Sequence, residues 1–422
     1  MRSKFVIGTV LGLFVLFGWL LGHIYGVLLA VYEETTIFKD LEYSWVFRLL
    51  LNLVGYSTVI LPCFALYKYL EKTHYFEKIT NNNWVSRLLR TMFLEQERLP
   101  EVVRVDESLP HESVELALCV VGLMGAYLVW GLLQEKIMTT DYVLSDGSLC
   151  RFTDSQFLVF VNRVLGSLVA LVRLRATRRP LFPAPLYKFS YCALTNIVSA
   201  WCQYEALKFV SFPTQVLSKS CKVIPVMLMG KLISRAKYES YEYVTAVLIS
   251  LGMALFLFGT GEDHAWGAPS VSGACLLVLY LCCDSFTSSW QGALFRRHGL
   301  QPLQMLLCVS LCSCSLSAAA LLGRPLPALI SQPSFVADAC LLALSSAAGQ
   351  LIIYRTIARF GPVVFAICMT LRQAGSVLLS CLVFGHRVSA GGAAGVTLVF
   401  SSVFLRLYWR RRRAPLAAPG DK

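Results

Sequence analysis

Three cationic side chains interrupt long apolar runs of this chain. Lys219 and Lys222 stand three residues apart in FPTQVLSKSCKVIPVMLMG, and Arg372 stands in GPVVFAICMTLRQAGSVLLSC. A cation in hydrocarbon costs roughly 2.5–3.5 kcal/mol on insertion scales, so each of these residues needs a partner or a water-filled cavity. A cavity that gathers three cations would receive an anion, and this chemistry is typical of a membrane transporter.

Polar side chains near these cations extend the candidate site. Gln215, Lys219 and Lys222 share one helix face by their spacing. Pro225 predicts a kink beside the lysines, because it removes a backbone donor and frees the carbonyl near Cys221.

Other polar groups inside apolar runs are less specific, because each also suits a helix–helix hydrogen bond. They are Asn162, Arg163, Gln203, Tyr204, Glu205, Gln350, Tyr354 and Gln373. As ligand contacts, Tyr204 or Tyr354 would give a base a stacking face. An amide of Gln203 or Gln373 would read an adenine edge.

The cations also have structural interpretations. Lys208 and Lys231 stand near the ends of apolar runs, where a lysine extends its charge to the membrane interface. For the three central cations, Glu205 or Asp284 would neutralise one charge as a structural ion pair. These alternatives stay open at the level of sequence.

The composition predicts a polytopic membrane protein. The 422 residues are 56% hydrophobic and only 15% charged, whereas soluble domains are about 25% charged. The net charge of +13 does not indicate a nucleic-acid partner, because the basic residues are scattered over short loops. The expected solvent is therefore a lipid bilayer, and the expected fold class is all-α.

Hydropathy predicts where the chain crosses the bilayer, given that a span needs about 20 apolar residues. An N-terminal run at 5–31 and a span at 45–67 precede a polar stretch. Ten core spans follow, at 114–134, 154–173, 187–209, 213–234, 242–260, 269–286, 301–323, 335–357, 361–385 and 390–409.

These spans define five regions of the chain. They are N-terminal spans at 1–70 (a hairpin or signal anchor), a polar cytosolic linker at 71–113, five-helix repeats at 114–260 and 261–409, and a basic cytosolic tail at 410–422. The N-terminal run is longer than a signal-peptide core and lacks a small-residue cleavage site, so it is expected to be retained. Basic residues dominate alternate loops and the tail, which places both termini in the cytosol.

The core contains a weak internal repeat. The segment YEALKFVSFP (204–213) resembles YRTIARFGP (354–362), and at an offset of 150 Lys222 aligns with Arg372. Five spans per copy would make the second copy enter the membrane from the opposite side. Inverted repeats of this kind are typical of alternating-access transporters.

Longer strings resemble a known family. SAWCQYEALKFVSFPTQVLSKSCKVIPVMLMGKLISR (199–235), WGLLQEKIMT (130–139), RFTDSQFLVFVNRVL (151–165), DSFTSSWQGALF (284–295) and MTLRQ with LLSCLVFGH (369–386) are similar to segments of the nucleotide-sugar transporter family, within the drug/metabolite transporter superfamily. The resemblance covers about 130–409, and the region before 113 has no evident counterpart. Within the family, the strings favour carriers of the activated sulfate donor adenosine 3′-phosphate 5′-phosphosulfate (PAPS).

This resemblance implies a Golgi antiporter that moves PAPS from cytosol to lumen in exchange for a nucleotide such as adenosine 3′,5′-bisphosphate. Residence in the endoplasmic reticulum is the lesser option, and a homodimer stays open. Such a ligand would carry about −4 charges, against +3 from Lys219, Lys222 and Arg372. An exchanger of nucleotide sugars or of ATP and ADP is the alternative within this fold. A membrane enzyme is the alternative from another class, but the sequence has no Walker A loop, no catalytic constellation and no cofactor motif.

Overall fold

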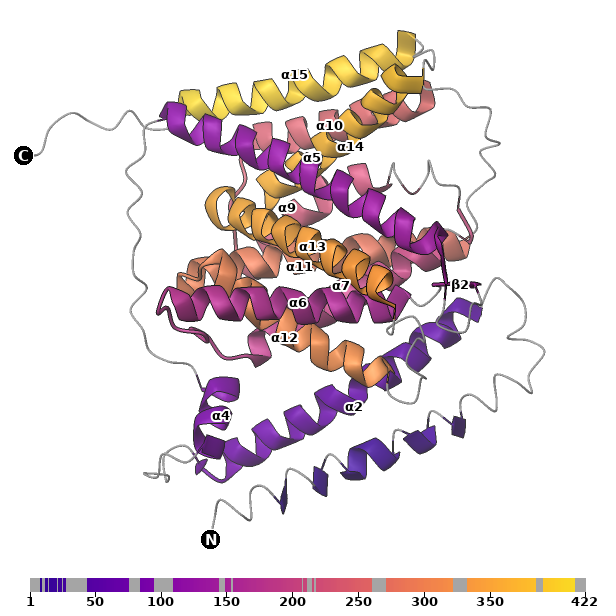
Figure 1. Cartoon of the computed structure of the whole chain (residues 1–422). Helices are drawn as coiled ribbons and strands as arrows, with labels where there is room; N and C mark the ends of the chain where they lie inside the picture. Colours follow the sequence, from indigo (N-terminus) through magenta and orange to yellow (C-terminus); the bar gives the residue numbers. More distant parts are fainter. Residues whose placement is uncertain are drawn as a thin grey trace, which may run out of the picture. The chain divides into compact units, whose positions relative to one another are not determined.

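The structure is a computed structural model, and it describes most of the core of the chain. The described residues are 44–75, 84–94, 109–143, 149–152, 155–206, 208–210, 215, 218–259, 271–321, 332–384 and 390–413, with short helical pieces between 8 and 27. Nearly all of these residues are helical (Figure 1). The retention of residues 1–31 therefore stays a prediction.

The helices occupy the positions that hydropathy predicts. They are α2 (Ser44–Lys72), α4 (Trp84–Phe93), α5 (Leu109–Thr139), α6 (Ser155–Ala176), α7 (Tyr187–Ala206), α9 (Val223–Ser234), α10 (Ser240–Gly259), α11 (Val271–His298), α12 (Pro302–Leu321), α13 (Pro333–Phe360), α14 (Pro362–Phe384) and α15 (Ala390–Arg413). Among described residues, five helices are long and apolar enough to cross a membrane: Trp45–Lys72, Val114–Ile137, Phe157–Ala176, Val271–His298 and Pro333–Phe360. Shorter apolar helices lie in most of the other predicted spans.

The residues group into two units, each assembled from separate stretches of the chain. Unit 1 comprises Met1–Ser108, Val121–Ile197 and Phe295–Arg355. Unit 2 comprises Leu109–Val120, Val198–Leu294 and Thr356–Lys422. The inverted-repeat relation between 114–260 and 261–409 remains a prediction.

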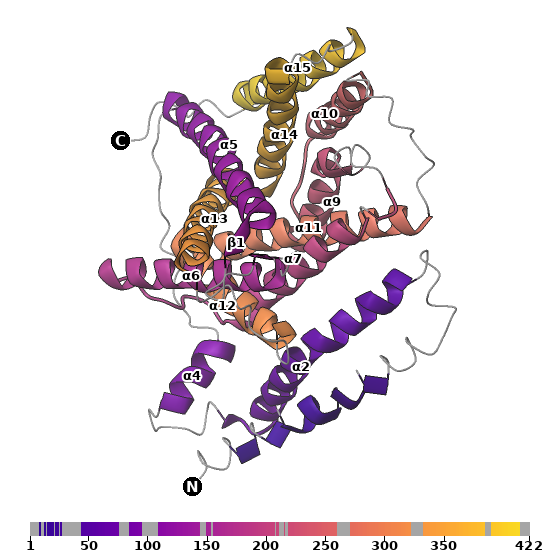
Figure 2. The ribbon, with the colours of Figure 1, turned by 45° about the vertical axis from the view of Figure 1, so that its right-hand side comes forward.

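In unit 1, α12 packs against α6 and α2 (Figure 2). Tyr56, Ala193 and Leu316 form one of its buried clusters. The polar stretch 71–113 contains a helix of its own, because α4 buries Leu89 and Phe93 against the end of α2.

Unit 1 also holds a β-hairpin that an all-α prediction missed. Strands β1 (Asp141–Val143) and β2 (Leu149–Arg151) pair antiparallel, with Tyr142 opposite Cys150. The Tyr142 hydroxyl donates a hydrogen bond to Asp338 at 3.1 Å, and the Lys136 ammonium pairs with the same carboxylate at 2.7 Å. Strands this short give too weak a pattern to predict, and their position depends on these contacts and on the buried Tyr142 ring.

In unit 2, α10 packs along α15 and α9 packs against α14 (Figure 1). Two glycines bring α10 and α15 together. A Cβ built on Gly395 would lie 2.6 Å from the carbonyl oxygen of Gly252, and one on Gly252 would lie 2.8 Å from Val399. Small residues that let helix backbones approach are a common device in membrane bundles.

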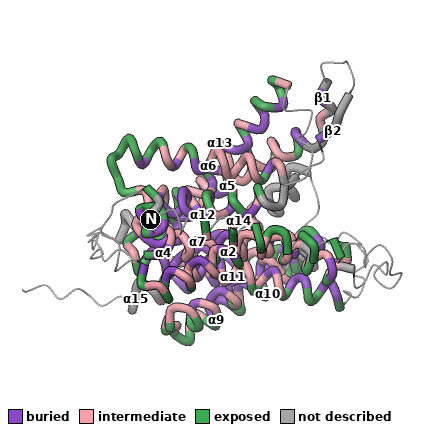
Figure 3. Tube along the Cα trace, turned by 90° about the horizontal axis from the view of Figure 1, so that it is seen from below, coloured by how far each residue is buried: buried purple, intermediate pink, exposed green. Residues whose placement is uncertain are grey.

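Helix α10 has an exposed side with apolar residues, which suits contact with lipid. Its described residues Ala246, Ile249 and Met253 are fully buried, whereas Val247 and Leu251 are about half exposed at 54% and 50%. Exposed residues likewise continue along the lengths of the helices in Figure 3. Apolar side chains exposed in rows would be a liability in water but are the expected outer surface in a bilayer.

Helix α11 corrects one predicted boundary. Hydropathy ended this span at 286, but the helix continues to His298. The added turns contain Ser288, Ser289 and Gln291, which lower the local hydropathy although all three are buried. Hydropathy is averaged over all faces of a helix. A helix whose polar residues face other helices is therefore predicted to be a loop.

The close approach of α10 and α15 yields a prediction about stability. Gly395→Ala should lower the melting temperature of the detergent-solubilised protein, because overpacking of this kind costs about 1–3 kcal/mol. Gly125→Ala in α5 is the matched control, since a Cβ there would meet nothing within 4 Å. Equal melting temperatures for the two variants would contradict the contact.

Candidate functional site

The two lysines lie at an interruption of the helix. Ser218–Ser220 are helical, Cys221 and Lys222 form a turn, and α9 begins at Val223. Pro225 lies in the first turn of α9, where the absence of a backbone donor costs little. The helix is therefore interrupted at Cys221 and Lys222, just before Pro225, and both lysines lie at this interruption.

Lys222 is buried against two other helices of unit 2. Its ammonium lies 2.7 Å from the Asp284 carboxylate of α11 and 5.1 Å from the centre of the Phe365 ring of α14. The side chain of Lys222 is only 8% exposed, against 25% for Asp284. Of the two structural ion pairs that the sequence left open, the one with Asp284 is therefore present.

Lys219 and Arg372 complete a cluster around this pair. Lys219 lies close enough to Arg372, Asp284 and Lys222 for each to act on its charge. Both Lys219 and Arg372 are partly buried. The described part of unit 2 thus brings the three predicted cations together with one carboxylate.

Neutral hydrogen bonds hold the backbone around the cluster. The Ser220 hydroxyl donates to the Gln373 side-chain oxygen at 3.3 Å, and the Thr370 hydroxyl donates to the Ser220 carbonyl at 3.5 Å. The Gln215 amide donates to the Gln203 carbonyl at 2.6 Å. Gln215 and Gln373, both predicted as ligand contacts, therefore also have structural partners.

Glu205 and Tyr204, the remaining candidates of unit 2, differ in how far they are exposed. Glu205 is 6% exposed and pairs with Lys208 at 2.9 Å. The neighbouring Tyr204 is 58% exposed, so its ring faces away from the buried interior of the unit.

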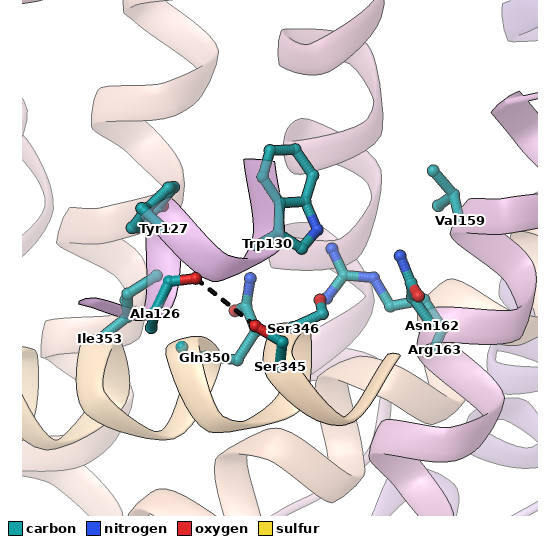
Figure 4. Close-up of a pocket in the computed structure, with 11 residues that line it drawn as sticks. Ala126, Tyr127, Trp130, Val159, Asn162, Arg163, Ser345, Ser346, Gln350 and Ile353 are labelled. Atoms are coloured by element: carbon teal, nitrogen blue, oxygen red, sulfur yellow. Dashed lines mark hydrogen bonds between the residues drawn. The ribbon is translucent and has the colours of Figure 1, made fainter. Parts of the chain in front are cut away.

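Two predicted residues belong to unit 1, and one of them lines the cavity described there. Arg163 lies at a cavity of ≈ 210 Å³ between α5, α6 and α13 (Figure 4). Tyr354 is not among the lining residues: it is 1% exposed, and its ring lies 6.5 Å from that of Phe295.

Sequence reasoning missed the aromatic wall of this cavity. Tyr127 and Trp130, three residues apart on α5, line it with ring centres 6.4 Å apart. The i, i+3 spacing was the available signal. It gave no reason to prefer these two rings over others in the chain.

A helical, multi-pass bundle with a buried cation cluster beside a broken helix defines a membrane transporter. Residues 115–410 match the UAA transporter family. The chain belongs to this family of nucleotide-sugar transporters, and it is a transporter rather than an enzyme.

Individual relatives refine this assignment. The Drosophila melanogaster protein named adenosine 3′-phospho 5′-phosphosulfate transporter 1 is 47% identical over 395 residues, covering 89% of this chain and 85% of its own. The Arabidopsis thaliana protein named UDP-galactose/UDP-glucose transporter 5B is 39% identical over 300 residues, covering 68% of this chain and 85% of its own. A solved crystal structure with 12% identity has a TM-score of 0.52 and covers 70% of this chain and 98% of its own, which is a likeness of fold alone.

The extent of the first match corrects an expectation about the N-terminal region. Residues 114–422 are 309 of 422, or 73% of the chain, so a match over 89% must include part of the region before 113. That region therefore has a counterpart in the relative, although the short segments that resemble the family did not reveal it.

The Lys222–Asp284 pair yields a second prediction. Asp284→Asn should lower the melting temperature, because breaking a buried pair from one side costs up to about 3–5 kcal/mol, less here since Asp284 is a quarter exposed. The double variant Lys222→Met/Asp284→Asn should recover part of this loss.

The exposed Lys68–Glu71 pair is the control, because its side chains are 60% and 54% exposed. Glu71→Gln should change stability by about 0–1 kcal/mol. A double variant less stable than the sum of the two single losses would contradict the proposed pairing.

Proposed function

We propose that this chain carries PAPS from the cytosol into the Golgi lumen, in exchange for a nucleotide such as adenosine 3′,5′-bisphosphate. The observation that carries the proposal is the cluster of Lys219, Lys222 and Arg372 within unit 2. The relative named as a PAPS transporter supports the choice of substrate, since its match extends further along the chain than that of the UDP-sugar carrier.

The charges of the cluster suit a polyanion. Three cations and the Asp284 carboxylate leave a formal charge of +2, against about −4 on a ligand with two phosphate-type groups and a sulfate. The sequence alone predicted +3, because it left the pairing of Lys222 open. An arriving phosphate would displace Asp284 from contact with Lys222 and free the ammonium to pair with the ligand, while the Asp284 carboxylate keeps its charge nearby.

Each cation would act on the anion in its own way. The Arg372 guanidinium is planar and offers a bidentate fork to an oxyanion, whereas the lysines act as point charges. The N-terminal end of α9 begins at Val223 and adds a partial positive charge beside Lys222. The site would therefore bind phosphate or sulfate oxygens strongly and without metal.

Exchange rather than leak would follow from the same charges. Closing the carrier's cavity around a cluster of net positive charge costs free energy, and a bound polyanion lowers this cost. The empty carrier would therefore reorient slowly, which couples inward and outward trips. The motion would be a rocking of the two predicted five-helix repeats.

The proposed topology places both termini in the cytosol. Its support is the excess of basic residues in alternate loops and in the tail Arg410–Arg413. All three cations belong to one chain, so a homodimer would pair two carriers that each hold a whole cluster. Residence in the Golgi membrane, rather than the endoplasmic reticulum, comes from the family resemblance.

Arg372→Ala gives the decisive test. Reconstituted in proteoliposomes, this variant should lose PAPS counterflow by at least about tenfold, because a charge-assisted hydrogen bond is worth roughly 1.5–3 kcal/mol. Arg372→Lys should retain part of it. Arg297→Ala is the control, since Arg297 is exposed in the last turn of α11. Wild-type counterflow rates in well-folded Arg372→Ala protein would remove the role.

A panel of exchanged nucleotides separates the alternatives within the family. The plant relative favours a UDP-sugar carrier as the second candidate. Inhibition of PAPS counterflow by adenosine 3′,5′-bisphosphate, with little effect of UDP-sugars and ATP, is the expected outcome. Stronger competition by UDP-sugars or by ATP would assign the chain to the corresponding alternative.

A further inference from the structure

The cavity of unit 1 has features of an oxyanion site. Arg163 projects from α6 toward Trp130 of α5 and Ser346 of α13 (Figure 4). None of the eleven lining residues is aspartate or glutamate, and several offer N–H or O–H donors. A cavity of this composition would attract an anion and repel a cation.

Arg163 has no counter-ion in the described part of the chain. No ion pair or hydrogen bond joins its guanidinium to another described residue, although it lies in the middle of a helix that is apolar enough to span the bilayer. A guanidinium stays charged in proteins and is costly inside a membrane unless an anion or water meets it. The position is therefore unfavourable structurally and reasonable as a ligand contact.

Asn162 adds a second unsatisfied group to the same wall. Among the described residues its buried Oδ1 atom has no hydrogen-bond partner, and Asn162 lines the cavity directly beside Arg163. Buried acceptors are nearly always satisfied in folded proteins, so an exception in a cavity indicates a missing donor. An oxygen acceptor next to a cation fits a ligand that carries an oxyanion and a hydroxyl on neighbouring atoms.

The size of the cavity suits one fragment of a ligand. Its volume of ≈ 210 Å³ is below the range of about 300–1,000 Å³ for pockets that enclose a whole drug-sized molecule. A phosphorylated ribose ring is a fragment that offers one oxyanion and a vicinal hydroxyl. In a nucleotide that is phosphorylated at the 3′ position, the neighbouring hydroxyl is the 2′-OH.

We propose that this cavity of unit 1 binds the 3′-phosphorylated ribose of adenosine nucleotides. Arg163 binds the 3′-phosphate in a bidentate manner, and the Asn162 side-chain oxygen accepts a hydrogen bond from the 2′-hydroxyl. Trp130 and Tyr127 exclude water from one side, which strengthens the charge–charge attraction. This inference rests on the proposed function, because it assumes a substrate with a 3′-phosphate.

The test compares three probes in thermal-shift binding and in competition with PAPS counterflow. They are adenosine 3′,5′-bisphosphate, its 2′-deoxy analogue, and adenosine 5′-monophosphate, which lacks the 3′-phosphate. The wild-type protein should bind the bisphosphate roughly ten- to a hundredfold more tightly than the monophosphate. In Arg163→Gln this ratio should fall close to one, with Arg163→Lys intermediate and the affinity for the monophosphate unchanged.

Asn162→Leu tests the hydroxyl contact separately. It should abolish the preference for the ribose over the deoxyribose bisphosphate while keeping the preference for the 3′-phosphate. Arg173→Gln is the matched control, because Arg173 is exposed near the end of the same helix. It should keep both preferences of the wild-type protein.

The outcomes separate this inference from the function on which it rests. If the wild-type protein exchanges PAPS and Arg163→Gln keeps the full preference for the 3′-phosphate, the subsite is overturned and the transport function stands. If the wild-type protein neither binds nor exchanges any of the adenosine nucleotides, the proposed function falls and the subsite with it. Unchanged affinity for the monophosphate shows that Arg163→Gln is folded, so a lost preference is not a loss of structure.

Discussion

The pairing of Lys222 with Asp284 is the interaction on which the candidate site of unit 2 depends. It lets a lysine lie almost fully buried in an apolar helix bundle, 2.7 Å from a carboxylate and close enough to Lys219 to act on its charge. A full set of counter-ions would make the cluster an inert structural network. A bundle with no carboxylate would have to bury three charges, at a free-energy cost that is rarely tolerated in membrane helices. Asp284 stabilises the buried Lys222, and the four described residues Lys219, Lys222, Arg372 and Asp284 still have more bases than acids.

The sequence predicted the helices and the cations, because both depend on local composition. Most spans were placed to within a few residues, and Lys219, Lys222 and Arg372 were singled out since charge inside an apolar run is conspicuous. The partner of Lys222 could not be chosen this way. Glu205 and Asp284 are equally plausible acids in a list of residues, and only the packing of α11 against the broken helix distinguishes them.

Features whose signal depends on facing direction were harder to predict. The second half of α11 is polar in composition but buried, so averaging over the helix hides it. Tyr354 and Tyr204 are similar as aromatic residues in the sequence, yet one is sealed in the interior and the other is exposed. Trp130 and Asn162 matter in unit 1 because α5, α6 and α13 turn them toward one cavity. The residue types alone do not indicate how each helix is rotated about its axis.

The two predicted repeats place their cations on unlike backbones, and this difference has consequences for anion binding. Lys222 stands at a break before α9, where the helix dipole places a partial positive charge at the first residues of the helix. Arg372 stands within the unbroken α14. Arg372 offers a planar fork of donors from the continuous helix, whereas the lysines beside the break act as point charges that set no preferred direction on an anion. A planar fork and two point charges together would recognise one oxyanion by geometry and tolerate variation in the rest.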